Sequence, residues 1–275
     1  MKVAIASGKG GTGKTAIATN LAVSNNITLF DCDVEEPNAH LFFDIKLQKV
    51  EDVCLKIPII DEKKCTLCGK CSKFCQYNAL AVLPSHVLFF PELCHGCSGC
   101  KLICPEGAIS EGERSIGVIE KGTVNKIDFY RGILNIGEAM ATPIIKALKK
   151  RIKESKDVIL DSPPGNACPM IETIKDVDYC ILVTEPTPFG LYDLKLAVDI
   201  VKKFNLPFGV IINKDGIGNK GVEKYCMEEG IEILMKIPYN REIASLYSKG
   251  KLFALEMQEW KEKFQELFMV IREKI

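Results

Sequence analysis

Cysteines dominate the middle of this sequence, where eight of the 13 lie within one short segment. They form two runs in which three cysteines are spaced by two residues and a fourth follows after three more: Cys65, Cys68, Cys71 and Cys75, then Cys94, Cys97, Cys100 and Cys104. The second run repeats the first 29 residues later, and Asn78-Ala79-Leu80 recurs at the same offset as Gly107-Ala108-Ile109. In a reducing compartment, clustered thiols are more often metal ligands than disulfides. The repeat therefore predicts a duplicated metal-binding unit.

This pattern resembles that of bacterial ferredoxins with two [4Fe-4S] clusters, in which the fourth cysteine of each run binds the cluster of the other run. The resemblance implies cluster I on Cys65, Cys68, Cys71 and Cys104, and cluster II on Cys94, Cys97, Cys100 and Cys75. Zinc is the alternative, but zinc modules usually place a longer loop between two cysteine pairs. Gln76 stands where ferredoxins usually have a proline, which affects the local turn and leaves the ligands in place.

A second chemical signal is a glycine-rich loop near the N-terminus, between an apolar run and a helical stretch over residues 16–23. It matches the phosphate-binding GxxxxGKS/T pattern through Gly8, Lys9, Gly10, Gly11, Thr12, Gly13, Lys14 and Thr15. In such loops, backbone N–H groups and the helix N-terminus bind phosphate oxygens, the lysine supplies charge and the hydroxyl binds Mg²⁺. A chance glycine-rich turn is the alternative, but the strand before the loop and the helix after it favour binding of ATP and Mg²⁺.

The second lysine of this loop, Lys9, distinguishes it from an ordinary phosphate-binding loop. The form KGGTGKT resembles the deviant Walker A motif of the MinD/ParA family and of the nitrogenase iron protein. In that family the early lysine reaches the phosphates bound to the other subunit of a homodimer. The resemblance therefore implies an ATP-dependent homodimer in which Lys9 and Lys14 both contribute to catalysis. An exposed surface charge is the alternative for Lys9.

Carboxylates follow two other apolar runs that are expected to be strands. Asp31 and Asp33 follow the second run, whereas Asp161 ends a later one and precedes a loop that contains Gly165. Ligands of open α/β sheets bind at the carboxyl ends of the strands. By the family resemblance, Asp33 orients the attacking water beside Mg²⁺, and Asp31 and Asp161 support the metal. The amide of Gly165 is then expected to sense the γ-phosphate. An ordinary turn carboxylate is the alternative for Asp31 and Asp33.

Two later segments resemble the adenine-binding parts of the same family. Asn213 ends the apolar run 210–212 at the place where the family reads the base. Pro238 lies in Ile237-Pro238-Tyr239, which resembles the loop that closes over the base. A plain strand-end turn is the alternative for this second segment.

The elements that must position these residues are short β-branched runs alternating with helical patterns. The runs cover residues 3–6, 27–30, 158–160, 180–183, 210–212 and 231–234. Such alternation predicts an α/β P-loop NTPase with a mainly parallel sheet and helices on both faces. It is interrupted over residues 62–111, where a small α+β ferredoxin domain is expected. The prediction is therefore a discontinuous ATPase domain, residues 1–61 and 112–275, with the ferredoxin domain inserted.

Charge and hydropathy exclude several function classes. The chain has 36 Lys and Arg against 36 Asp and Glu, so no net basic field favours nucleic acid or an anionic membrane. No stretch approaches the roughly 20 apolar residues that span a bilayer, and no export signal is visible. Trp260, Phe264 and Ile271 recur at helical spacing among alternating Lys and Glu, which favours core packing over membrane binding. The sequence predicts a cytoplasmic protein.

The other five cysteines are expected to have different roles. Four of them fall in or beside apolar stretches and are expected to pack as small hydrophobic side chains: Cys32, Cys54, Cys180 and Cys226. Cys168 follows Asp161 at the place where the nitrogenase iron protein has a ligand of its subunit-bridging cluster. No second such cysteine lies around residues 131–141. Packing or a redox-sensitive thiol is therefore the expectation for Cys168.

Three functions fit these motifs. The first is an ATPase whose nucleotide state is coupled to electron transfer through two [4Fe-4S] clusters, with a redox or cofactor-assembly protein as its partner. The second is an iron–sulfur or metal-cofactor carrier related to the Mrp/Nbp35 scaffold ATPases, in which the clusters are cargo. The third is a spatial organiser like MinD or ParA. The complete ferredoxin ligand set favours the first, because it indicates permanent clusters.

Overall fold

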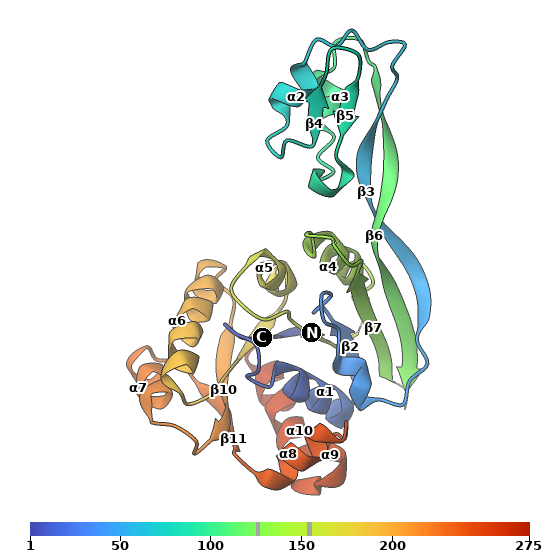
Figure 1. Cartoon of the computed structure of the whole chain (residues 1–275). Coiled ribbons are helices and arrows are strands. Elements are labelled where there is room, and N and C mark those ends of the chain that lie inside the picture. Colours follow the sequence, from blue (N-terminus) through green and yellow to red (C-terminus); the bar gives the residue numbers. More distant parts are fainter. Residues whose placement is uncertain (125–126, 153–155) are drawn as a thin grey trace.

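The computed structural model describes residues 1–124, 127–152 and 156–275. Over these residues the main element is a nine-stranded sheet with the order β11-β10-β9-β1-β8-β2-β7-β6-β3 (Figure 1). Its strands are β1 (Lys2–Ala6), β2 (Thr28–Asp31), β3 (Gln48–Ile60), β6 (Ile109–Val124), β7 (Ile127–Leu134), β8 (Val158–Asp161), β9 (Tyr179–Thr184), β10 (Phe208–Asp215) and β11 (Ile233–Pro238). Neighbours from β11 to β7 are parallel, whereas β6 is antiparallel to β7 and β3. The predicted α/β fold with a mainly parallel sheet is confirmed.

Helices cover both faces of this sheet (Figure 1). One face packs against α4 (Thr142–Lys149), α5 (Cys168–Ile174), α6 (Pro188–Lys203) and α7 (Gly221–Glu228), and the other against α1 (Lys14–Asn25), α8 (Arg241–Ser248), α9 (Phe253–Glu256) and α10 (Gln258–Glu273). Because successive side chains of a strand point to opposite faces, β1 places Ala4 and Ala6 in one core and Val3 and Ile5 in the other. This burial of both faces explains why the central strands read as continuous apolar runs.

β3 and β6 extend beyond the sheet as a long two-stranded ribbon that carries the cysteine-rich segment (Figure 1). Their pairing extends from Gln48 opposite Lys121 to Ile60 opposite Ile109, with two local shifts of register. The residues between the two strands, 61–108, form a small unit at the far end of the ribbon. The small unit and the ATPase part are therefore joined by two strands, β3 and β6, which are hydrogen-bonded to each other along the length of β3.

The small unit repeats its backbone geometry as well as its sequence. It contains α2 (Lys70–Phe74), α3 (Gly99–Ile103) and a hairpin of β4 (Leu80–Val82) and β5 (Val87–Phe89), with a 3₁₀ turn η2 (Pro91–Leu93). Gly69 and Ser98, which precede the two helices, both have left-handed backbone, with φ of 76° and 60°. Asn78 and Gly107 likewise share φ of 54° and 58°. The two halves are thus structural as well as sequence repeats.

The sequence expectations omit three strands and misplace one cysteine. β3, β6 and β7 lack the continuous apolar runs of the central strands. β3 is the edge strand on this side of the sheet, and part of it alternates buried and exposed residues. Cys54 lies on this strand and is exposed, so the prediction that it packs as a hydrophobic side chain is wrong. Cys32, Cys180 and Cys226 are fully buried, as predicted.

The C-terminal helix α10 packs into the core as predicted. Its apolar stripe is buried, with Trp260 3% exposed and Phe264 and Ile271 fully covered. The stripe contributes to the core face that also contains Leu21 and Ala22 of α1. None of the described helices is long and apolar enough to cross a bilayer.

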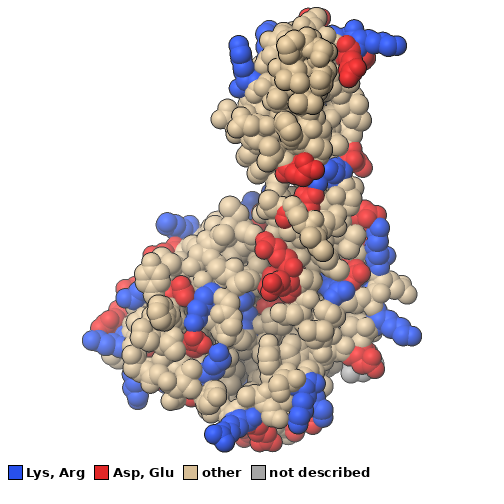
Figure 2. All heavy atoms as spheres, viewed as in Figure 1, with Lys and Arg blue, Asp and Glu red and all other residues tan. Residues whose placement is uncertain are grey.

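Charges of both signs are intermixed on the surface. Figure 2 shows Lys and Arg alternating with Asp and Glu over the ATPase part, while much of the small unit on this face carries neither. On the face shown, and among the described residues, the basic side chains do not form one continuous patch of the kind that binds a nucleic-acid backbone.

Candidate functional site

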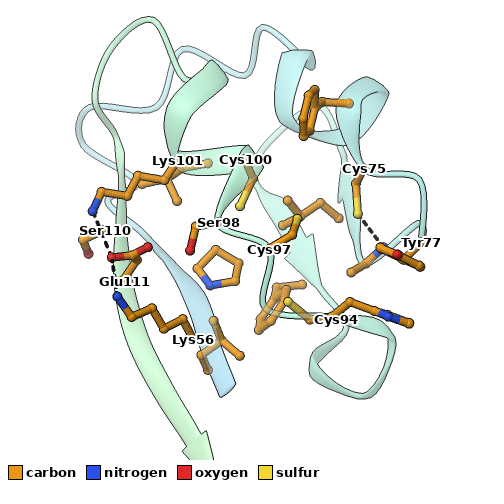
Figure 3. A pocket seen from close by; sticks show the side chains of 18 residues that line it. Lys56, Cys75, Tyr77, Cys94, Cys97, Ser98, Cys100, Lys101, Ser110 and Glu111 are labelled. Atoms are coloured by element: carbon orange, nitrogen blue, oxygen red, sulfur yellow. Dashed lines mark hydrogen bonds and ion pairs between the residues drawn. The ribbon is translucent and has the colours of Figure 1, made fainter. Parts of the chain in front are cut away.

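The eight repeated cysteines line two separate pockets in the small unit. One pocket is lined by Cys75, Cys94, Cys97 and Cys100, and the other by Cys65, Cys68, Cys71 and Cys104. Figure 3 shows the first pocket, where Cys75 comes from the end of α2 and the other three come from the loop before α3 and from α3 itself. Each pocket takes three cysteines from one run and the last from the other, which is the crossed arrangement that the ferredoxin resemblance implies.

The fourth cysteine of each run accepts a backbone hydrogen bond. The Ala79 N–H donates to Cys75 Sγ at 3.4 Å, and the Ala108 N–H donates to Cys104 Sγ at 3.3 Å. A donor to sulfur favours the thiolate, which is the ligand form, and hydrogen bonds to sulfur are one determinant of cluster potentials. The two halves of the small unit thus supply the same donor at the same offset.

The two four-cysteine sets can be compared with the ligand geometry of a single metal ion and of a cluster. A tetrahedral zinc site would hold its thiolates about 3.8 Å apart, given a zinc–sulfur bond of about 2.3 Å. Among the described residues, no group of three or more His, Cys, Asp or Glu side chains is gathered closely enough to hold one metal ion. The walls of the pockets include the apolar side chains of Leu80 and Phe89 in one and of Val82 and Val87 in the other. Four soft thiolates around an apolar pocket suit an iron–sulfur cubane.

A third pocket lies at the carboxyl edge of the sheet. It gathers residues that the sequence assigned to nucleotide binding, together with neighbours on β11 and α8: Gly10, Gly11, Gly13, Lys14, Thr15, Asp33, Asn213, Pro238, Tyr239, Asn240 and Tyr247. α1 begins at Lys14, directly after Gly13 in left-handed backbone with φ of 94°. The N-terminus of α1 therefore opens onto this pocket, which is the usual arrangement for binding phosphate.

Contacts with β10 and α6 hold the phosphate loop in place. Asn213 Nδ2 donates to the Thr12 carbonyl at 2.8 Å, and Lys214 Nζ donates to the Gly11 carbonyl at 3.0 Å. On the opposite side, Gly8 approaches α6 so closely that a Cβ would lie 2.2 Å from the Asp193 carbonyl oxygen. Asn213, predicted to read adenine, therefore has one of its amide N–H groups committed to the loop, and only the other is left for a base.

Lys9 is held within its own chain by Glu185, the residue that directly follows β9. The Lys9 ammonium pairs with Glu185 Oε1, while Lys214 Nζ lies 3.2 Å from Glu185 Oε2. Although burial acts to raise the pKa of Glu185, the hydrogen bonds from Lys9 and Lys214 lower it below its ordinary value. Glu185 is thus an ionised carboxylate that holds the lysine predicted to reach across a dimer.

Replacing Glu185 should therefore strengthen ATP-dependent dimerisation. We expect Glu185→Gln to tighten the predicted dimer by about fivefold, because one partly exposed ion pair is released in each chain and each contributes on the order of 0.5 kcal/mol. Sedimentation velocity with Mg²⁺ and a non-hydrolysable ATP analogue would measure this. Glu223→Gln, which breaks the remote pair with Lys236, is the matched control and should leave the dimer unchanged. A weaker dimer in Glu185→Gln would contradict the holding role.

Asp161 is the carboxylate best placed for Mg²⁺. It ends β8, is 1% exposed, and neither of its carboxylate oxygens has a hydrogen-bond partner among the described residues. Burial raises its pKa to about 7, against the opposing charge of Lys14. A buried carboxylate without a partner is costly unless a cation compensates it. The donors at this position therefore fit Mg²⁺.

Asp31 and Asp33 differ sharply in their surroundings. Asp31 is fully buried and accepts backbone N–H groups on both oxygens, from Asp33 at 3.1 Å and from Ala39 at 3.0 Å. These bonds shape the turn after β2, so Asp31 supports the position of Asp33. Of the two buried carboxylates, Asp161 is the one whose oxygens remain available for a metal ion. Asp33 lines the nucleotide pocket, and burial raises its pKa to about 6, with Lys14 opposing the shift.

The Gly165 amide, predicted to sense the γ-phosphate, donates to the Ser7 carbonyl at 3.1 Å. Gly165 has left-handed backbone with φ of 92°, which a larger residue would adopt only with strain. The bond ties the loop after β8 to the end of β1, directly before the phosphate loop. Contact of this amide with a phosphate would therefore require the bond to Ser7 to open.

Sequence reasoning did not single out Glu185, beside the phosphate loop, or Tyr247, in the pocket itself. Glu185 is a carboxylate directly after a predicted strand, and the general rule that ligands bind at the carboxyl ends of strands could have singled it out. Tyr247 lines the pocket from α8, and its pKa is raised by burial and by the charge of Asp161. No local pattern identifies Tyr247, because its position depends on how α8 returns over the sheet.

Known proteins have sequences similar to that of this chain. An uncharacterised protein of Methanocaldococcus jannaschii is 34% identical over 279 residues, which cover 99% of this chain and 97% of the relative. An iron-sulfur cluster carrier protein of Pyrococcus furiosus is 25% identical over 264 residues, covering 86% of this chain and 73% of that relative.

Solved structures and family models agree with the fold. The septum site-determining protein MinD of Pyrococcus horikoshii, solved with Mg-ADP, superposes with a TM-score of 0.58 at 17% identity, covering 97% of this chain and 93% of that one. This similarity concerns the fold alone. The model of the CobQ/CobB/MinD/ParA nucleotide binding domain matches residues 3–253. Because the match spans the phosphate loop, Asp161 and Asn213, the chain belongs to the CobQ/CobB/MinD/ParA nucleotide-binding family.

Proposed function

We propose that this protein is an ATPase that couples its nucleotide state to electron transfer through two [4Fe-4S] clusters. The observation that carries the proposal is the pair of four-cysteine pockets at the end of a ribbon whose strands belong to the nucleotide-binding sheet. When bound, the clusters would supply one-electron transfer at potentials set by their surroundings. The chain's own part is to hold the thiolates and to move them with the sheet.

In the ATPase part, each residue has a separate task. Lys14 and the N–H groups of the phosphate loop hold the phosphates at the N-terminus of α1. Thr15 and Asp161 would hold Mg²⁺, which neutralises phosphate charge when bound. Asp33 lines the pocket and is placed to orient water. Phosphoryl transfer needs little covalent chemistry, so this positioning and charge would supply most of the rate.

The homodimer belongs to the same proposal. In the single chain the Lys9 ammonium pairs with Glu185. Binding of ATP by two chains would let each Lys9 leave Glu185 for the partner's phosphates, and the partner would complete the site. The electron donor or acceptor would be a separate protein that docks on the small unit.

The proposal is tested by measuring both halves of the protein in both directions. Protein purified without oxygen should contain about eight iron atoms per chain, as two [4Fe-4S] clusters require. We expect ATP turnover to differ between oxidised and reduced protein, and the cluster potentials to shift when Mg²⁺ and a non-hydrolysable ATP analogue bind. The proposal would be overturned if the ATP turnover rate did not depend on oxidation state and the cluster potentials did not depend on bound nucleotide.

A second candidate is an iron–sulfur cluster carrier, which the names of several relatives favour. The two candidates differ in how firmly the clusters are held. Four ligands for each cluster within one chain favour permanent clusters, whereas a carrier must release them. Incubation with an apo-ferredoxin acceptor distinguishes them, because a carrier would lose iron to it within minutes, in an ATP-dependent manner, and an electron-transfer protein would keep it.

A further inference from the structure

The segment that follows Asp33 is fixed on the end of β7. The Leu134 N–H donates to the Val34 carbonyl at 2.8 Å, and Val34 is 1% exposed. Gly132 of β7 packs so closely here that a Cβ would lie 2.7 Å from Val34 Cγ1. A displacement of Asp33 toward or away from nucleotide is therefore expected to displace the end of β7, since close-packed contacts transmit movement.

The residues after β7 lie on the base of the ribbon. The Asn135 N–H donates to the Ile116 carbonyl at 2.9 Å, and Asn135 Nδ2 donates to the Ser115 carbonyl at 3.3 Å. The Glu138 N–H in turn donates to the Asn135 carbonyl at 3.1 Å. The turn 135–138 is thus attached through hydrogen bonds to β6, between the nucleotide-binding sheet and the small unit.

Arg114 of β6 and Glu138 of this turn form a bidentate ion pair. Both carboxylate oxygens accept guanidinium N–H groups, with Arg114 Nη2 and Glu138 Oε2 3.1 Å apart, and the side chains are only 19% and 13% exposed. A bidentate arginine–carboxylate pair fixes orientation as well as distance. The hydrogen bond that Arg114 donates to Glu138 raises the pKa of Arg114, and the charges of Glu92 and Cys94 add to this effect. Arg114 therefore lies close to the cluster II side of the small unit.

The loop between Cys94 and Cys97 rests on the ribbon at this level. Leu55 of β3 is the cross-strand partner of Arg114. A Cβ placed at Gly96 would lie 3.4 Å from Leu55 Cβ and 3.2 Å from the Lys56 carbonyl oxygen. At this level of the ribbon, Arg114 on β6 binds Glu138, on the side of the Asp33 segment. Its cross-strand partner Leu55 on β3 lies against the loop proposed to bind cluster II.

From these contacts we propose that the Arg114–Glu138 pair is the joint through which nucleotide-driven movement of the Asp33 segment reaches the Cys94–Cys97 loop. The inference rests on the proposed coupling of nucleotide state to the clusters and names the residues that transmit it. The two strands of the ribbon extend far from the sheet. The ion pair attaches the base of the ribbon to the turn 135–138, and through it to the segment after Asp33. Two sites are coupled when a structural element between them has two conformations and ligand binding at either site shifts the equilibrium between these conformations. Cluster I, at the far end, should respond less.

The test compares Glu138→Gln with a control pair that also ties the ribbon to the ATPase part. Glu51 on β3 pairs with Arg151 after α4 and does not contact the turn 135–138, so Glu51→Gln is the matched control. Hydrogen–deuterium exchange of residues 92–98 and the cluster II potential are measured with and without Mg²⁺ and a non-hydrolysable ATP analogue. Arg114→Lys, which keeps the charge and loses the bidentate geometry, serves as a second variant.

We expect nucleotide to change both readouts in the native protein and in Glu51→Gln. In Glu138→Gln and Arg114→Lys the nucleotide-dependent difference should fall by about fivefold or more, while nucleotide affinity stays within about twofold. An undiminished response in both joint variants overturns the joint and leaves the proposed coupling intact. An equal loss in Glu51→Gln also overturns it, since any tether would then suffice. Absence of a response in the native protein overturns the coupling and the joint together.

Discussion

Asp161→Asn is expected to abolish most ATP turnover and, at the same time, to stabilise the nucleotide-free protein. Asn cannot supply the charge that Mg²⁺ requires, so we expect turnover to fall by about 10² to 10³, the range seen when an electrostatic contact to the transition state is removed. The gain in stability has a separate cause. The native carboxylate is buried without a hydrogen-bond partner among the described residues, and removing its charge removes that cost.

The pH dependence of stability gives this prediction its sign. Asp161 has its pKa raised from 3.8 to about 7 by burial, so between these values the folded state binds more protons than the unfolded state. Without Mg²⁺, the native free energy of unfolding should therefore fall as pH rises from about 4 to about 7. At pH 7 the Asn variant should be more stable by on the order of 2 to 4 kcal/mol, because folded and unfolded pKa values that differ by one correspond to about 1.4 kcal/mol.

Urea denaturation of the nucleotide-free and Mg²⁺-free protein at pH 5 and pH 7 would measure these differences. Asp157→Asn is a suitable control, because Asp157 precedes the same strand but pairs with the Met1 amino group and Arg272. That substitution removes favourable contacts and should not stabilise the protein. An Asp161→Asn variant that is less stable than the native protein at pH 7 would show that the carboxylate is compensated in solution.

Pairs of cysteine substitutions should show which thiolates share a cluster. Any single Cys→Ala change among the eight proposed ligands should lower the iron content from about eight to about four atoms per chain. The crossed arrangement makes a sharper prediction for pairs. Cys65→Ala with Cys104→Ala should still leave about four iron atoms, because both residues line the same pocket. Cys94→Ala with Cys104→Ala should leave almost none, because these residues line different pockets.

Iron and sulfide analysis of anaerobically purified variants, together with EPR of the reduced proteins, would check these values. Cys54→Ala is the matched control, since Cys54 is exposed on the ribbon and lines neither pocket, and it should retain about eight iron atoms. The reverse result, with Cys94 and Cys104 sharing a cluster, would mean that each run binds its own cluster. Loss of all iron in every single variant would mean that the small unit folds only with both clusters.

The consequence of the ribbon for function is mechanical. The cysteine-rich unit is joined to the sheet by twelve residue pairs of β3 and β6, so movement at the nucleotide can reach it without unfolding a linker. The same ribbon holds α3 through Lys101, whose Nζ donates to Glu111 Oε2 at 3.0 Å (Figure 3). The small unit is thereby oriented by the ATPase part, which would suit the proposed presentation of clusters to a partner in one nucleotide state.

Features that depend on short spacing could be predicted from the amino-acid sequence. The cysteine runs, the phosphate loop and the six parallel strands predicted from apolar runs are each set within a few residues, because ligand spacing, loop geometry and burial against the helices leave local patterns. Asp161 and Lys14 were identifiable for the same reason. The crossed sharing of Cys75 and Cys104 came only from the ferredoxin resemblance, and no local pattern contains it.

Contacts between residues far apart in the sequence were decided only by the tertiary structure. Edge strands such as β3 carry no continuous apolar run, so the ribbon is not visible in the sequence. The engagement of both Asp31 oxygens by backbone depends on the turn after β2, and the holding of Lys9 by Glu185 joins residues 176 apart. The pairing of Arg114 with Glu138 likewise exists only once β6 and the turn after β7 lie together. The physical reason is that an ion pair or a shared pocket depends on how elements far apart in the chain are placed in space. A local sequence pattern does not determine that placement.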